Sequence, residues 1–191
     1  MVRLERTDSD NCHFIELVKH LDADLAKRDG SEHSFYAQFN KIDSIKYVVV
    51  AYEEGIPVAC GAIKEYVPAT MEVKRMYTLP RSRGKGIASK VLAELEQWAG
   101  ELSYTKCILE TGKRQPEAIA LYKKNGYRYI PNYDSMRKWK TVSALKRESD
   151  SNTTFDPTIV QARLPISQRT LLEPPLTDRS PLCRSLRKDI D

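Results

Sequence analysis

The feature that most constrains the fold of this chain is the stretch at residues 73–88, VKRMYTLPRSRGKGIA. Residues 71–79 are mostly β-branched, aromatic or long apolar, which predicts a strand, and Pro80 cannot continue strand pairing. Apolar residues then recur every three or four positions, at Ile87, Val91, Leu95, Trp98 and Leu102. This spacing predicts an amphipathic helix, so a strand, a short turn and a helix stand at the centre of the fold.

The turn between this strand and this helix has the composition of an anion site. Gly84 and Gly86 lack a Cβ atom, so a ligand can approach the main chain closely. The first N–H groups of a helix have no partner within it, and Arg81, Arg83 and Lys85 add positive charge. These features predict a site for an anion, most simply a phosphate. The alternative from these residues alone is a glycine-rich turn with solvated charges.

The rest of the pattern predicts an α+β domain. Strands are expected at residues 1–6, 47–52, 57–66, 106–111 and 127–130, and helices at 11–26, 33–40 and 115–125. With the central strand and helix, this order predicts a mostly antiparallel sheet with one parallel crossover. The 191 residues have the length of one domain with an appendage.

Composition narrows the classes of function. The N-terminus has no apolar signal segment and no apolar run approaches the ~20 residues of a membrane span, so a cytoplasmic protein without a membrane partner is expected. The four cysteines and three histidines show no metal-ligand spacing, and no metal is expected. The net charge of +5 suits a polyanionic cofactor. Because basic residues are spread along the whole chain, nucleic acid is not an expected partner.

Two motifs give the sequence a resemblance to the GNAT family of acyl-CoA-dependent N-acyltransferases. Residues 81–86, RSRGKG, match the family's Q/R-x-x-G-x-G/A loop for the acyl-CoA pyrophosphate. Residues 110–128, ETGKRQPEAIALYKKNGYR, are similar to the segment that joins the family's fifth and sixth strands. The resemblance covers residues 1–133 and implies the GNAT fold. In that fold the central mixed sheet has helices on both faces and a splay between the fourth and fifth strands.

The resemblance also implies an enzyme, an N-acetyltransferase that moves an acetyl group from acetyl-CoA to a primary amine by direct attack. Tyr122 matches the family tyrosine that protonates the departing thiolate, although a tyrosine on an apolar helix face is usually a core residue. Glu72 stands where some family members carry the base, and a water relay or a solvated strand residue are the alternatives. Glu110 is a second, weaker carboxylate candidate.

The predicted cofactor site combines the central strand, its loop and the helix after the next strand. By resemblance, the main chain of the strand pairs with the pantetheine and the loop amides hold the pyrophosphate. The predicted residues are Met76, Tyr77, Thr78, Arg81, Arg83, Gly84, Lys85, Gly86, Ile87, Ala88 and Gln115. Gln115 departs from the asparagine frequent in the family. The acceptor, a small-molecule or peptide amine, stays open, as does a homodimer, and a non-catalytic acyl-CoA-binding module is the rival function.

Residues 134–191 differ in kind from the rest. They contain no glycine or tyrosine and five of the ten prolines, so we expect a disordered tail outside a domain at residues 1–133. Family members continue with a seventh strand of the type SVCFEK, which is absent from the reading frame. A permissive back-translation of residues 136–146, read two bases later, gives AEMENSVCFEK. This result predicts a frameshift near Asp134, with a natural interaction tail as the alternative. An inactive product of such a shifted gene is an alternative to the active enzyme.

Overall fold

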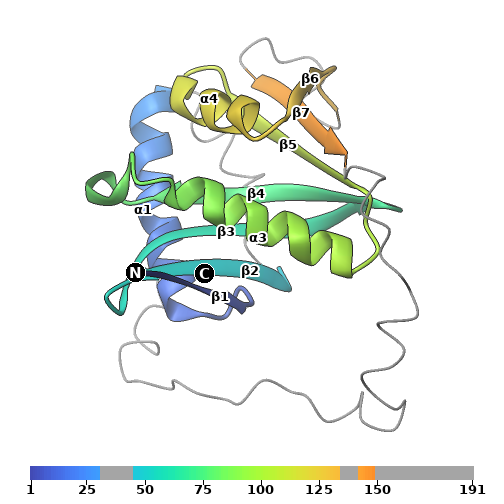
Figure 1. Ribbon diagram of the computed structural model, residues 1–191. Coiled ribbons are helices and arrows are strands. Elements are labelled where there is room, and N and C mark those ends of the chain that lie inside the picture. Colours follow the sequence, from blue (N-terminus) through green and yellow to red (C-terminus); the bar gives the residue numbers. More distant parts are fainter. Residues whose placement is uncertain (31–44, 134–141, 149–191) are drawn as a thin grey trace, which may run out of the picture. The chain divides into compact units, whose positions relative to one another are not determined.

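The structure is a computed structural model that describes residues 1–30, 45–133 and 142–148. Here a seven-stranded sheet carries helices on both faces (Figure 1). The predicted helix at residues 33–40 and a separate unit at residues 150–191 lie outside the described residues. The elements are β1 (Val2–Thr7), α1 (Cys12–Asp29), β2 (Tyr47–Glu53), β3 (Ile56–Val67), β4 (Thr70–Thr78), a 3₁₀ turn (Pro80–Ser82), α3 (Ile87–Glu101), β5 (Lys106–Gly112), α4 (Pro116–Lys124), β6 (Arg128–Ile130) and β7 (Val142–Glu148).

The strand order in the sheet is β1-β2-β3-β4-β5-β7-β6. Neighbouring strands are antiparallel except β4 and β5, which run parallel. This topology confirms the prediction of an α+β fold with a mostly antiparallel sheet and one parallel crossover. The strands and helices predicted within the described residues are present, and their ends differ from prediction by a few residues.

Both faces of the sheet are buried because its central strands are apolar on both sides. Residues 48–51 of β2 are fully buried, and successive side chains of a strand point to opposite faces. Val48 and Val50 pack in one core with the apolar stripe of α1. Val49 and Ala51 pack in the other core with α3. The two helices therefore hold β4, which lies within the sheet, from opposite sides.

The sheet opens between β4 and β5. The two strands pair only along residues 70–72 of β4, and beyond them the β5-facing edge of β4 has no strand partner in the described part of the chain. Figure 1 shows the two strands meeting at one end and separating toward the other. This separation confirms the predicted splay.

A β-bulge in β4 bends the strand beyond the point where β4 and β5 part. Gly61 of β3 faces two residues of β4, Arg75 and Met76, and Arg75 has a positive φ of 56°. An extra residue on one strand bends it and increases its twist. The Arg75 side chain is 4% exposed and donates to both carboxylate oxygens of Asp22 in α1, at 2.9 Å each. The bulge is thereby fixed to the helix.

Gly61 provides the space that the bulge needs, which gives a testable prediction. A Cβ atom at this position would lie 2.3 Å from the Met76 sulfur and 2.9 Å from a Leu95 methyl carbon. We expect Gly61→Ala to lower the free energy of unfolding by about 1–3 kcal/mol, because three packed side chains must move. Chemical denaturation measures the change. The control is Gly100→Ala in α3, where a Cβ atom meets nothing within 4 Å; equal midpoints for the two variants would contradict this packing.

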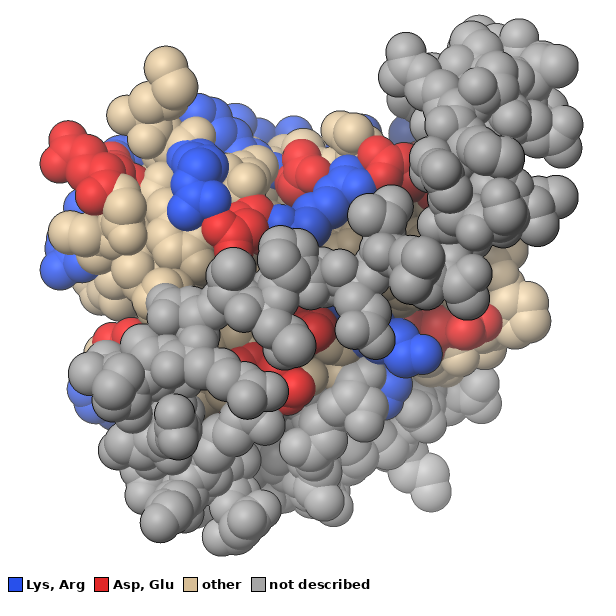
Figure 2. Space-filling view, turned by 90° about the horizontal axis from the view of Figure 1, so that it is seen from below, with Lys and Arg blue, Asp and Glu red and all other residues tan. Residues whose placement is uncertain are grey.

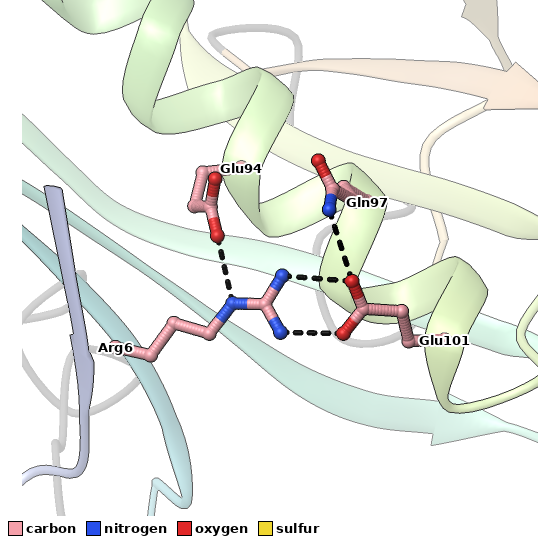
Figure 3. A network of polar contacts seen from close by, with 4 residues as sticks. All are labelled: Arg6, Glu94, Gln97 and Glu101. Atoms are coloured by element: carbon pink, nitrogen blue, oxygen red, sulfur yellow. Dashed lines mark hydrogen bonds and ion pairs between the residues drawn. The ribbon is translucent and has the colours of Figure 1, made fainter. Parts of the chain in front are cut away.

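Arg6 fastens the outer strand β1 to α3 (Figure 3). Its Nε donates to Glu94 at 2.7 Å and its Nη2 to Glu101 at 3.0 Å. Gln97 donates to the same Glu101 carboxylate, and the guanidinium lies 4.9 Å from the ring centroid of Trp98. The hydrogen bond to Glu101 is the largest cause that raises the pKa of Arg6.

The surface charges of the described residues are mixed in sign. On the face seen in Figure 2, basic and acidic side chains are interspersed.

The prediction that the seventh strand is missing is wrong. Residues 142–148 form β7, which pairs antiparallel with β5 and with β6. The segment VSALKRE has few strand-favouring residues, but strand pairing is made by main-chain groups, and β5 and β6 both offer edges. Arg147 of β7 also donates to Glu96 of α3 at 2.8 Å. The compact unit therefore ends at Ser149 rather than Tyr133. The predicted disorder and frameshift of the remainder stay predictions.

Candidate active site

A cavity of about 320 Å³ lies beside the separated end of β4. Its walls come from α1, the end of β4, the loop after β4, the start of α3, and α4. A volume of this order suits a small molecule or part of a larger cofactor. The cavity therefore occupies the place where the splay and the glycine loop meet.

The loop presents unused main-chain donors to this cavity. Gly84 and Gly86 line it and have positive φ values of 79° and 76°. In the described part of the chain, the N–H groups from Gly84 to Ala88 donate to no main-chain carbonyl. The amide of Arg83, also predicted to hold pyrophosphate, instead donates to the carbonyl of Pro80 at 3.3 Å. Open amides at the start of a helix are donors of the kind that bind anions.

Two cationic side chains of the loop, those of Arg83 and Lys85, pair with carboxylates. Arg83 lines the cavity, pairs with Asp24 of α1 at 3.0 Å, and donates from Nε to the carbonyl of Thr78 at 2.9 Å. Lys85 points to Glu53 instead, at 3.0 Å, and this hydrogen bond is the largest cause that lowers the pKa of Glu53. Arg83 is thus the loop cation that borders the cavity, whereas Lys85 is directed away from its lining.

Tyr122 of α4 lines the cavity although its side chain is buried. Burial raises the pKa of its hydroxyl, so the group is a protonated donor at neutral pH. Its ring packs against Tyr127, with centroids 5.6 Å apart. Among the described residues, no other side chain forms a hydrogen bond with this hydroxyl, which is therefore available to a ligand.

Glu72 is not part of the cavity lining. It lies at the point where β4 and β5 stop pairing, which we call the fork of the sheet. It faces Ile108 in the last paired position of β4 and β5. Its carboxylate pairs with Lys74 at 3.0 Å and accepts a hydrogen bond from the Tyr133 hydroxyl at 3.3 Å. Glu110 of β5 accepts from the main-chain N–H of the same Tyr133, at 3.1 Å. Both carboxylates proposed from the sequence thus accept hydrogen bonds from Tyr133.

The structure brings most of the predicted site residues together around the cavity. Those that line it are Met76, Tyr77, Thr78, Arg83, Gly84, Gly86, Ile87, Ala88, Gln115 and Tyr122. Arg81, Lys85 and Glu72 are not part of the lining. Sequence reasoning missed the contribution of α1, where Arg28 reaches Glu117 of α4 at 2.6 Å. No local pattern in α1 could indicate this, since its cavity-facing residues are spaced like any helix face.

Comparison with known proteins fits this geometry. The model of the acetyltransferase (GNAT) family matches residues 14–127. The chain belongs to the GNAT acetyltransferase family. It is 34% identical over 117 residues to the IAA acetyltransferase of Azospirillum brasilense, an alignment that covers 59% of this chain and 75% of the relative. Membership of the GNAT family makes the protein an acyltransferase enzyme.

Solved GNAT structures share the fold. A Klebsiella pneumoniae protein assigned as an acyl-CoA N-acyltransferase superposes with a TM-score of 0.66 at 25% identity, over 78% of this chain and 97% of that one. The PaiA N-acetyltransferase of Thermoplasma acidophilum, solved in complex with coenzyme A, gives a TM-score of 0.57 at 13% identity, over 78% and 99%. Among the described residues of our GNAT protein, no helix is both long and apolar enough to cross a bilayer.

Proposed function

We propose that this GNAT protein transfers the acetyl group of acetyl-CoA to a primary amine by direct attack. The observation that carries the proposal is the cavity that Gly84, Gly86 and Tyr122 line together: among the described residues, the amides of residues 84–88 donate to no main-chain carbonyl and the Tyr122 hydroxyl forms no hydrogen bond. The unpaired edge of β4 at Met76, Tyr77 and Thr78 supplies main-chain groups for the pantetheine arm. An N–H there can stabilise the oxyanion that develops during transfer.

The chemistry requires two proton movements. An alkylamine has a pKa of ~10.4, so removing its proton at pH 7 costs about 4–5 kcal/mol. Glu72, directly or through a water relay, accepts that proton as the nitrogen bonds to the acetyl carbon. The carbon–sulfur bond breaks and Tyr122 donates its proton to the thiolate. Burial raises the pKa of Tyr122, so its hydroxyl carries a proton at neutral pH and can donate it to the thiolate.

The acceptor amine is either a small molecule or a peptide. The segment at residues 31–44, part of which was predicted to be a helix, lies outside the described residues. The rival function, a non-catalytic acyl-CoA-binding module, shares the loop and cavity but releases no free thiol.

The proposal predicts both binding and turnover. Calorimetry with CoA should detect one site per chain, and thiol release from acetyl-CoA should rise with at least one member of a panel of amines, amino acids and peptides. The panel also includes IAA, the compound named in the IAA acetyltransferase of Azospirillum brasilense. We expect Glu72→Gln to lower kcat by about 10- to 100-fold with CoA affinity retained, because the base is lost.

Glu16→Gln, on the exposed side of α1, serves as the matched control for this substitution. Binding without turnover for every amine would favour the acyl-CoA-binding module. No binding of CoA to folded protein would refute both functions.

A further inference from the structure

We propose that Tyr133 is a positioning residue that bridges the open fork of the sheet and fixes the carboxylate of Glu72 for proton transfer. The inference rests on the proposed function, in which Glu72 is the base. It concerns a residue that lies just after β6 and outside both sequence motifs.

The geometry gives Tyr133 one contact on each side of the fork. Its hydroxyl donates to Oε1 of Glu72 in β4 at 3.3 Å, and its main-chain N–H donates to Oε1 of Glu110 in β5 at 3.1 Å. Its ring packs on Tyr66 of β3, with centroids 4.9 Å apart. Because β4 and β5 stop pairing at Glu72, these contacts join the strands where their own hydrogen bonds end.

These contacts give different roles to the carboxylates of Glu110 and Glu72. Glu110 is occupied in anchoring the main chain of Tyr133, so it is a support rather than the base. Oε1 of Glu72 accepts a hydrogen bond from the Tyr133 phenol, and Oε2 accepts one from the Lys74 ammonium at 3.0 Å. These two donors fix the position of both carboxylate oxygens. The side chain of Glu72 is 17% exposed, so little water competes with them.

Two further described residues face Glu72 from the neighbouring strands. Lys64 of β3 is its register partner and is exposed, and Ile108 faces it from β5. Burial, followed by the charges of Glu72 and Glu110, raises the pKa of Tyr133. The phenol therefore remains a donor over the pH range in which an acetyltransferase works, and it does not itself titrate.

The test is Tyr133→Phe in the full chain, which keeps the ring and removes one hydroxyl. With the glutamate carboxyl carbons labelled with ¹³C, and the signal assigned by Glu72→Gln, NMR at neutral pH should show the Glu72 carboxyl signal displaced from its wild-type position, because one of its hydrogen bonds is lost. This readout needs no acceptor. In turnover assays, kcat should fall by about 3- to 10-fold, with CoA affinity unchanged.

Tyr129→Phe is the matched control, since Tyr129 is 53% exposed on β6 and should leave the Glu72 signal and kcat unchanged. A Glu72 signal that does not move in Tyr133→Phe overturns the inference, even if the variant is less stable to heat. Full turnover by Glu72→Gln would instead show that Glu72 is not the base, a failure of the proposed function that is distinct from this one.

Discussion

Replacing Tyr122 with Phe should lower kcat for thiol release by about 100-fold or more while CoA still binds. The phenol hydroxyl lines the cavity and forms no hydrogen bond with another described residue, so its removal leaves no buried partner unsatisfied. What is lost is the proton for the departing thiolate, and general acid catalysis typically contributes 10²–10⁴-fold. Steady-state kinetics with the best amine of the panel, together with calorimetry for CoA, separates the two effects.

The matched control for this substitution is Tyr127→Phe. Tyr127 is similarly buried and packs against Tyr122, but it does not line the cavity. The control should keep turnover near the wild-type value. If Tyr122→Phe keeps it too, Tyr122 is a core residue, the alternative that the sequence left open, and another group or water protonates the thiolate.

The strand, loop and helix at the centre of the site were predictable because their signals are local. Pro80 ends the strand, Gly84 and Gly86 supply the left-handed φ values that the loop requires, and the apolar spacing defines α3. The same is true of the topology, since short connections between antiparallel strands limit the arrangements that a sheet can adopt. Local chemistry was therefore sufficient to predict the strand, the loop and the helix that border the cavity.

The parts that sequence reasoning missed depend on contacts between distant residues. Arg75, at the bulge of β4, adopts a positive φ although it is not a glycine, because its guanidinium is buried against Asp22. The strand β7 forms because two neighbouring edges pair with it, although its own residues favour a strand only weakly. Tyr133 lies in no sequence motif, and its contacts with β4 and β5 become visible only in the folded sheet. In each case tertiary contacts decide the conformation, and no window of the sequence contains both partners.

Replacing Gly86 with Val should weaken CoA binding by about 100-fold or more. Gly86 caps α3 with φ at 76°, and a Cβ atom there would project into space that no protein atom fills within 4 Å. A branched side chain would thus stand where we place the pyrophosphate, and the strained φ would displace the N–H groups that hold it. A left-handed conformation costs a non-glycine residue about 1–2 kcal/mol, so stability should fall as well.

Gly55→Val separates strain from the site. Gly55 has a similar φ of 81° in the turn between β2 and β3, is equally free of neighbours, and lies outside the cavity lining. Both variants should lose similar free energy of unfolding in denaturant, but only Gly86→Val should lose affinity for CoA in calorimetry. Since strain is common to both, a difference in affinity reports the loop alone. Equal, undiminished affinity would mean that the anion site at the start of α3 does not hold the cofactor.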